Sequence, residues 1–256
     1  MKKFLQIFAL CALCVLAAPM VLAQNDEPVI TATKDNFFEA VWPIEKSGTI
    51  KLVGEIDSET IEVINERMEN VSLLGAVVRI GIDMSKTTGL KYIPEDAFRN
   101  NLLLVNIMLP ENLETIGRCA FFECEMLASI SIPNSVERIE EGAFIKCRHL
   151  KSITIPESVK IIETRAFAFC DKLEKITLPD GLKSIAESTF LDCKKLKSIT
   201  IPDSIENIGA QAFWDCKKLK TINYKGSKEQ WDAINKGQYW NECCPSTMKI
   251  NFNYQE

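Results

Sequence analysis

The chain has 256 residues, 46 % of them apolar and 25 % charged, a composition typical of a folded protein and unlike that of disordered or collagen-like chains. Its net charge of −5 and pI of about 5.2 provide no general basic surface for a nucleic-acid backbone, so we expect no nucleic-acid partner. His149 is the only histidine, which removes most acid–base and metal chemistry near neutral pH. The composition disfavours an enzyme, and we expect no cofactor and no metal.

Residues 1–23 have the three-part pattern of a secretory signal peptide. Two lysines precede an apolar run over residues 4–18, and Val21-Leu22-Ala23 leads abruptly into polar residues from Gln24 onward. An uncleaved membrane anchor is the alternative, but the apolar run is shorter than the roughly 20 residues that a spanning helix needs. We expect cleavage after Ala23, export of residues 24–256, and no membrane span in the mature chain.

One sequence unit recurs through the middle of the chain with a step of 23 residues. It reads L-x-x-I-x-[IL]-P-x-x-[VLI]-x-x-I-x-x-x-A-F-x-x-C. Its prolines are Pro110, Pro133, Pro156, Pro179 and Pro202, and its cysteines are Cys124, Cys147, Cys170, Cys193 and Cys216. A fixed period of this length predicts a solenoid, in which each copy buries its apolar side against its neighbours.

Each unit predicts a short strand that ends at the proline. Ile199-Thr200-Ile201 alternates apolar with polar residues, and Pro202 cannot donate a hydrogen bond to a sheet. In-register copies predict a parallel sheet on one face of the solenoid. The return path is too short for a long helix. We expect there a short extended piece around the second isoleucine, such as Ile208, and one helical or 3₁₀ turn through the Ala-Phe-x-x-Cys stretch. The predicted fold class is therefore an α/β solenoid.

These residues also carry a resemblance to a known family. The segment from Ser198 to Ile205, with Ala212-Phe213 and Cys216 closing the unit, resembles the leucine-rich repeats of the BspA-like, treponemal-type family, and the likeness extends over residues 80–224. The segment Tyr224-Lys225-Gly226-Ser227, with the Glu229-Gln230-Trp231 that follows, resembles that family's closing segment. The resemblance implies a leucine-rich-repeat solenoid that is secreted or displayed on a bacterial surface. It further implies adhesion or protein binding rather than catalysis.

We expect the solenoid to span residues 80–224 between two caps. Residues 24–79 predict a small α/β cap with an amphipathic stretch at 35–41, a strand at 48–56 and a helix at about 58–70. Residues 225–256 predict a second cap, with a helix that begins after Ser227 and a final strand within 248–254. Asn101 replaces the repeat cysteine, which marks the first coil as a transition into the cap.

The five repeat cysteines are expected to form one inward column of buried thiols. In-register side chains point parallel to each other, which is unsuitable for disulfides, so they should act as small apolar residues. A redox or metal role is the alternative. Cys119, Cys243 and Cys244 fall outside this column in the sequence pattern, and their redox state stays open. His149 is expected in a solvated turn.

Two exposed regions are candidate binding surfaces. The first, called here the sheet face, consists of the outward strand positions Asn106, Met108, Ser131, Thr154, Thr177, Thr200 and Asn223. The second, called here the basic rim, lies at the turn entering the strands of the last coils and consists of Lys194, Lys195, Lys197, Lys217, Lys218 and Lys220. Acidic residues after each proline predict an acidic opposite rim. The alternative for both regions is that threonine favours strands and charge keeps the surface soluble.

The sequence supports the hypothesis of a secreted or cell-surface binding module without enzymatic activity. It would recognise a host matrix protein, a neighbouring-cell surface protein or a glycan through the sheet face and the basic rim. A structural or periplasmic scaffold is an alternative. An enzyme or glycan-processing subunit with its chemistry in the first cap is a further one, disfavoured because residues 24–79 contain no histidine or cysteine.

Overall fold

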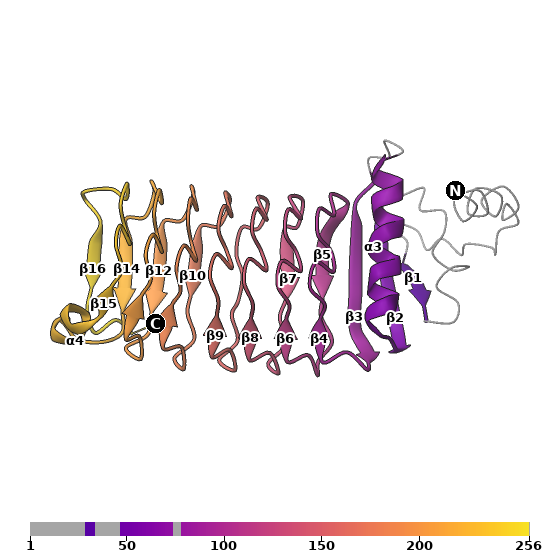
Figure 1. Ribbon diagram of the computed structural model, residues 1–256, viewed down its shortest axis with the longest axis horizontal. Coiled ribbons are helices and arrows are strands. Elements are labelled where there is room, and N and C mark those ends of the chain that lie inside the picture. The colour runs from indigo at the N-terminus through magenta and orange to yellow at the C-terminus, as the bar shows by residue number, and fades with distance from the viewer. Residues whose placement is uncertain (1–28, 34–46, 74–77, 256) are drawn as a thin grey trace, which may run out of the picture.

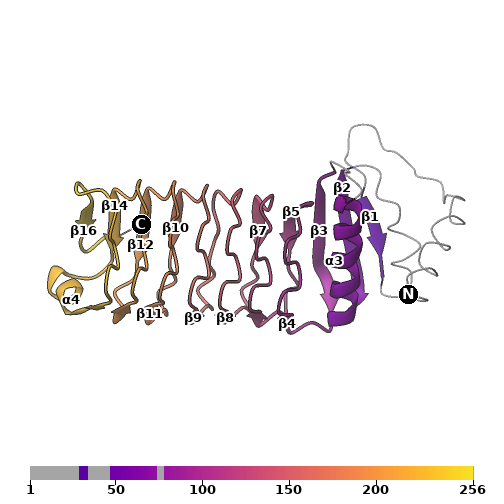
Figure 2. The same cartoon turned by 45° about the horizontal axis from the view of Figure 1, so that its top comes forward.

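The computed structural model describes residues 29–33, 47–73 and 78–255. Figure 1 shows an elongated solenoid whose coils follow one another along its long axis from the N-terminal to the C-terminal end, and Figure 2 shows the same order in a turned view. The expected signal peptide at residues 1–23 and the amphipathic stretch at 35–41 lie outside the described residues.

One face of the stack is built from long-range parallel pairing, one strand per coil. Its first sheet contains β1 (Val29–Ala32), β2 (Gly48–Glu55), β3 (Ile80–Thr88), β5 (Leu104–Met108) and β7 (Ser129–Ser131). Its second contains β10 (Lys175–Thr177), β12 (Ser198–Ile201), β14 (Thr221–Tyr224) and β16 (Lys249–Asn251). Ile107 pairs with Ile130 and Ile199 with Ile222, a separation of 23 residues in each case. The coil between the two sheets contributes only an isolated bridge, from Ser152 to Lys175.

The return path carries the short extended pieces that the second isoleucine predicts. They are β4 (Tyr92–Ile93), β6 (Thr115–Ile116), β8 (Arg138–Ile139) and β9 (Ile161–Ile162) in one sheet, and β11 (Ser184–Ile185), β13 (Asn207–Ile208) and β15 (Asn235–Lys236) in another. The expected parallel pairing therefore occurs on both sides of each coil.

The expected helical turn at Ala-Phe-x-x-Cys is wrong. In the described coils this stretch is a run of tight turns with residues in the left-handed region, such as Cys119 (φ 52°) and Glu123 (φ 57°). The Cys119 and Phe121 N–H groups donate to the carbonyls of Glu141 and Ala143 in the next coil. An α-helix would direct those N–H groups along its own axis instead. The left-handed residues thus let this stretch take part in coil-to-coil hydrogen bonding.

The N-terminal end is covered by α3 (Ser58–Leu73), which lies beside β2 and β3 (Figure 1). The helix buries Ile61, Ile64 and Met68. Asn101 joins it to the first coil: its Nδ2 donates to Asn65 Oδ1 at 2.7 Å, while its Oδ1 accepts from the Leu104 N–H at 3.0 Å. The predicted strand and helix of this segment are confirmed.

The C-terminal end is closed by an enlarged coil. Ser227 caps α4 (Lys228–Ala233), as predicted, in a capping box with Gln230. Cys244 Sγ donates to the Phe213 carbonyl at 3.2 Å, as the repeat thiols do to the phenylalanine carbonyls of their preceding coils. The expectation that Cys244 lies outside the thiol column is therefore wrong, because the segment containing α4 lengthens this coil and shifts the cysteine spacing.

The core consists of columns that run through consecutive coils. The repeat phenylalanines stack with ring centroids 5.3–5.7 Å apart and ring planes within 9° of parallel: Phe98, Phe121, Phe144, Phe167, Phe190 and Phe213. Leucine and isoleucine columns line the interior, and the five repeat cysteines are fully buried. The predicted inward thiol column is confirmed. A filled interior of this kind leaves the outer surface as the part that can meet a ligand.

Candidate binding surface

The sheet face is accessible in its first part. Met108 is 44 % exposed, Ser131 and Thr154 are exposed, and Asn106 and Thr177 are half-buried. Their outward direction follows from strand alternation, because Ile107 and Ile153 of the same segments point into the core. These five residues remain candidates for contact with a partner.

The last part of the sheet face is closed, contrary to expectation. Thr200 is 0 % exposed and Asn223 is 8 % exposed. The chain returns over this end after β16: the Asn253 and Tyr254 N–H groups donate to the carbonyls of Gly226 and Tyr224. Asn251 Nδ2 also donates to Asn223 Oδ1 at 2.9 Å. The expectation that Thr200 and Asn223 are available to a ligand is therefore wrong.

Half of the basic rim is neutralised by ion pairs between coils. Lys194 Nζ lies 3.0 Å from Asp171 Oδ1, and Lys197 Nζ lies 2.6 Å from Glu174 Oε2. Lys217 pairs with Asp215 at 3.0 Å. Asp171 also accepts from Arg148 Nη1 at 2.8 Å, which extends the pairs into a row along the rim. These lysines stabilise the stack weakly and offer little net charge to a partner.

The other half of the rim carries unbalanced positive charge. Lys195, Lys218 and Lys220 are exposed, and within the described part of the chain none of them has an ion-pair partner. Hydrogen bonding to Lys197 lowers the pKa of Glu174, and the charge of Lys195 contributes to the same shift. Lys195 and Lys218 occupy equivalent positions in consecutive coils, so their charges lie side by side.

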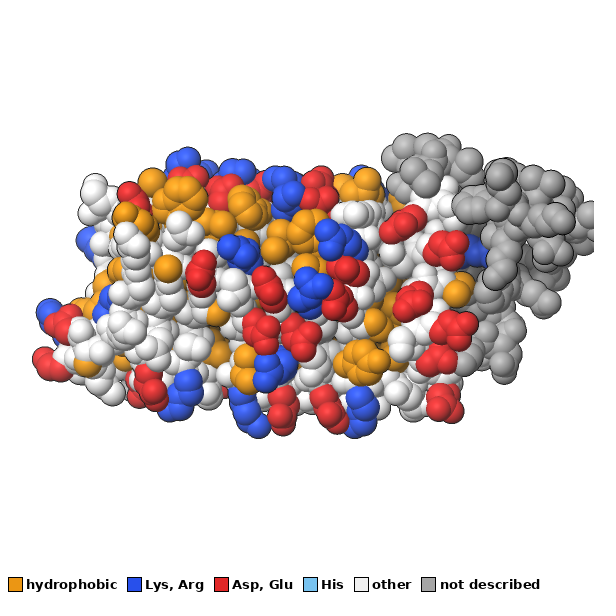
Figure 3. Space-filling model, in the orientation of Figure 1, with side chains coloured by type: hydrophobic (Ala, Val, Ile, Leu, Met, Phe, Trp, Pro, Cys, Tyr) orange, Lys and Arg blue, Asp and Glu red, His pale blue; other side chains and the backbone are white. Residues whose placement is uncertain are grey.

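The opposite rim is mixed rather than acidic. Its post-proline acids Glu111, Glu157, Asp180 and Asp203 are exposed as expected. Asp180, however, is paired with Lys225, and the neighbouring Glu206 lies 3.2 Å from Lys183. Figure 3 shows acidic and basic side chains interspersed over the visible face. The expected division into one basic and one acidic rim needs correction, since oppositely charged residues face each other across neighbouring coils.

The ionisable groups of the interior are held in unreactive states. Burial raises the pKa of the Cys147 and Cys216 thiols well above their ordinary value and raises that of Cys244 to about 12. A protonated thiol is a poor nucleophile and a poor metal ligand. His149 lies in a turn with its Nδ1 2.8 Å from the Glu125 carbonyl oxygen. Over residues 29–33, 47–73 and 78–255, no group of three or more potential metal ligands comes together.

The described segments also contain no helix with the length and apolarity needed to cross a bilayer. The arrangement suits noncovalent recognition through exposed side chains.

One feature of the surface was missed at the sequence level. A pocket lies beside α4, with Asp203, Tyr224 and Gln230 among its lining residues. The available signal was a break in the repeat: Tyr224 stands where earlier coils have isoleucine or leucine, and Lys225 replaces the proline.

Residues 91–220 match the family described as BspA type leucine rich repeat region, in six copies. No curated protein matches the sequence. The structure is similar to the crystal structure of the T. pallidum leucine rich repeat protein, with a TM-score of 0.57 and 26 % identity over 66 % of this chain and 80 % of that one.

A leucine-rich repeat protein from Bacteroides ovatus aligns with a TM-score of 0.45 and 24 % identity, over 68 % of this chain and 63 % of that one. A leucine rich cell surface protein from Faecalibacterium prausnitzii aligns with a TM-score of 0.26 and 17 % identity, over 86 % of this chain and 98 % of that one. The six consecutive copies, together with the parallel coils they form, identify the chain as a member of the BspA-type leucine-rich-repeat family.

Proposed function

We propose that the protein is exported and serves as a non-enzymatic binding module that recognises an acidic surface on a protein or glycan. Adhesion to matrix or neighbouring cells is the role that fits such a module. The binding surface combines the accessible sheet face, from Asn106 to Thr177, with the unpaired lysines Lys195, Lys218 and Lys220.

The juxtaposition of Lys195 and Lys218 is the observation that carries this proposal. Register between coils places equivalent residues about 4.7–4.9 Å apart at the backbone, so the two ammonium groups repel each other in the free protein. A carboxylate- or sulfate-bearing partner relieves that repulsion. The paired lysines of the same rim lack this driving force, because Asp171, Glu174 and Asp215 already balance them.

The test compares two sets of lysines in the processed chain, residues 24–256. Binding to immobilised collagen, fibronectin, heparin and desulfated heparin is measured for the wild type and for a triple variant, Lys195→Gln, Lys218→Gln and Lys220→Gln. We expect at least one probe to bind and the triple variant to weaken it by about tenfold.

The matched control is the double variant Lys160→Gln and Lys183→Gln. These lysines are exposed and ion-paired on the other rim, and their loss should leave affinity within about twofold. Equal losses in both variants, or wild-type affinity in the triple variant, would contradict the proposal.

The scaffold alternative differs in location rather than in surface. Labelling of intact cells with a membrane-impermeant reagent should modify an adhesin and spare a protein confined to the periplasm. Labelling only after the outer layer is disrupted would favour the scaffold.

A further inference from the structure

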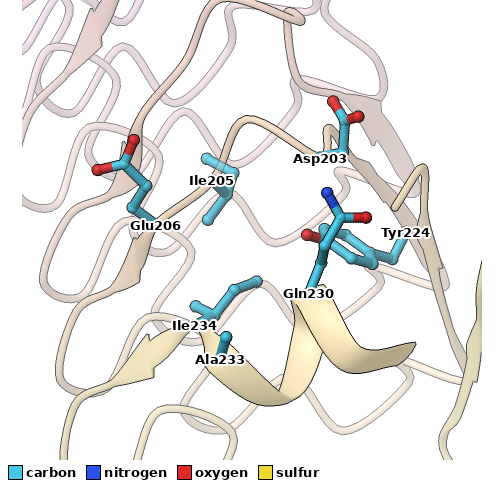
Figure 4. Close-up of a pocket in the computed structure, with 7 residues that line it drawn as sticks. All are labelled: Asp203, Ile205, Glu206, Tyr224, Gln230, Ala233 and Ile234. Carbon is cyan, nitrogen blue, oxygen red and sulfur yellow. The ribbon is translucent and has the colours of Figure 1, made fainter. Parts of the chain in front are cut away.

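A small pocket lies at the C-terminal end of the solenoid, on the rim opposite the unpaired lysines. Its volume is about 230 Å³, and its lining consists of Asp203, Ile205, Glu206, Tyr224, Gln230, Ala233 and Ile234. Figure 4 shows the turn that carries Asp203 and Glu206 facing α4 across the opening. Sites for drug-sized molecules measure about 300–1,000 Å³. The smaller volume is suited to a single side chain.

The pocket exists because the last coil departs from the repeat. Tyr224 pairs in register with Ile201 and so occupies a column that is aliphatic in the preceding coils. Its ring packs edge-on against Trp231, with centroids 5.1 Å apart. A Cβ built on Gly226 would lie 2.7 Å from Tyr224 Cε1, so glycine is needed there for the ring to fit. The hydroxyl of Tyr224 is therefore held in one place.

That hydroxyl is the unusual feature of the site. Tyr224 is 0 % exposed, and its hydroxyl oxygen has no hydrogen-bond partner. Figure 4 shows the hydroxyl directed toward the space between Ile205 and Ile234. A buried polar group without a partner costs about 1–3 kcal/mol. A ligand group that reaches this hydroxyl would remove the cost, which makes the tyrosine an anchor for a polar ligand atom.

The charge around the pocket selects the kind of ligand. Asp203 and Glu206 are both exposed at its edge, and none of the seven lining residues is basic. Desolvation, followed by the charge of Asp203, raises the pKa of Tyr224, which places that carboxylate within electrostatic range of the phenol. Gln230 is already engaged through its Oε1, which accepts from the Ser227 N–H at 2.8 Å. The free carboxylate of Asp203 therefore favours a cationic group.

The remaining lining is apolar. Ile205 and Ile234 are buried beside the opening, and the exposed Ala233 continues the same surface along α4. An aliphatic stem that ends in a charged head matches this combination of apolar wall, carboxylate edge and buried hydroxyl.

We propose that this pocket binds the side chain of an arginine or lysine presented by a partner polypeptide. The methylene stem lies along Ile205, Ala233 and Ile234, the charged head is held by Asp203, and a donor of the head reaches the Tyr224 hydroxyl oxygen. The site is separate from the lysine-containing surface and can succeed or fail independently of it.

The test uses the folded processed chain and short peptides. Acetyl-Gly-Arg-Gly-amide and acetyl-Gly-Lys-Gly-amide are titrated while Trp231 fluorescence and backbone amide NMR shifts are followed. The citrulline peptide is the neutral counterpart of the arginine peptide. We expect saturable shifts at residues 203–206 and 224–234 with both basic peptides, and at least tenfold weaker binding of the citrulline peptide. Shifts that map elsewhere, or equal binding of the citrulline peptide, would overturn the proposal.

Two substitutions separate binding from folding. Asp203→Asn should weaken the arginine peptide by about tenfold, whereas Glu111→Gln, an exposed acid at the equivalent position of an early coil, should not change it. Tyr224→Phe should also weaken binding, while leaving the denaturation midpoint unchanged or raised, because it removes an unsatisfied hydroxyl. Unchanged peptide affinity in both Asp203→Asn and Tyr224→Phe would contradict the proposed contacts. Free arginine or spermidine that binds as well as the peptides would contradict a polypeptide source.

Discussion

The thiol of Cys170 donates a hydrogen bond to the Phe144 carbonyl of the preceding coil at 3.3 Å. The same bond recurs along the stack, from Cys147 to Phe121 at 3.3 Å and from Cys193 to Phe167 at 3.2 Å. Each thiol thus fills core volume and also satisfies a buried carbonyl. This double role explains a column of cysteines in a chain that shows no reactive thiol chemistry in its repeats.

Replacement of one repeat thiol should therefore cost more than its size suggests. Cys170→Ala removes the sulfur from the core and leaves the Phe144 carbonyl without this donor, so we expect the free energy of unfolding to fall by about 1–3 kcal/mol. Urea denaturation followed by circular dichroism measures the change. Cys243→Ala, at an exposed cysteine, is the control and should stay within about 0.5 kcal/mol. Equal effects of the two substitutions would contradict the role given to the column.

The thiols should also make the fold sensitive to alkali. Burial raises the pKa of Cys147, Cys170 and Cys216 above the ordinary value of 9.0. The native state therefore keeps these protons at a pH where the unfolded state releases them. Their contribution to stability is complete below about pH 9 and is lost as the pH rises further.

The predicted loss is about 1.4 kcal/mol per pH unit for each protected thiol. Denaturation midpoints measured from pH 7 to 10.5 should fall above pH 9, and Cys170→Ala should reduce the slope by about one thiol's share. A slope that is the same in the variant would show that other groups cause the alkaline loss.

The sequence was sufficient for the repeating part of the fold. Prolines, phenylalanines and cysteines spaced by 23 residues predict parallel coils, because each apolar column has to meet itself in the next copy. The turn through Ala-Phe-x-x-Cys was mispredicted because its left-handed residues, such as Arg165 and Phe169, are not glycines and carry no conformational signal. Coil-to-coil hydrogen bonds hold them in that conformation.

The candidate surface was predicted less well, for two physical reasons. The closure of Thr200 and Asn223 depends on the chain returning from β16, which no periodicity encodes. The pairing of Lys197 with Glu174 was within reach of sequence reasoning, since the two residues are 23 positions apart and the register brings such residues together. Solenoid registers should be searched for opposite charges at the repeat spacing before a basic stripe is assigned to a ligand.

The phenylalanine stack should dominate the stability of the middle coils. The Phe144 ring lies 5.3 Å from the rings of both Phe121 and Phe167, measured between centroids. We expect Phe144→Ala to lower the free energy of unfolding by about 3–5 kcal/mol and Phe144→Leu to cost less, because leucine refills part of the volume. Denaturant titration tests the order. Phe122→Leu, at a half-exposed ring, is the control, and a larger loss there than at Phe144 would contradict the assignment of the core.

Asn101 should be specific to its coil. Its Oδ1 accepts from the Leu103 and Leu104 N–H groups, and its Nδ2 donates to Asn65 of α3. Asn101→Ala leaves two buried N–H groups without their acceptor, so we expect a loss of about 2–4 kcal/mol.

Asn101→Cys, which restores the repeat consensus, should fail to rescue that loss, because a thiol cannot replace the amide as both donor to Asn65 and strong acceptor. Thermal unfolding compares the three proteins. Full stability of the cysteine variant would contradict this explanation.

Lysine footprinting of a complex tests the binding surface most directly. The processed chain is acetylated with a limiting reagent, alone and bound to the tightest of the collagen, fibronectin and heparin probes, and each lysine is quantified by mass spectrometry. We predict at least threefold protection of Lys195, Lys218 and Lys220 on binding, with Lys160 and Lys183 unchanged. Protection of Lys160 and Lys183 with continued modification of Lys195 and Lys218 would contradict the proposed surface.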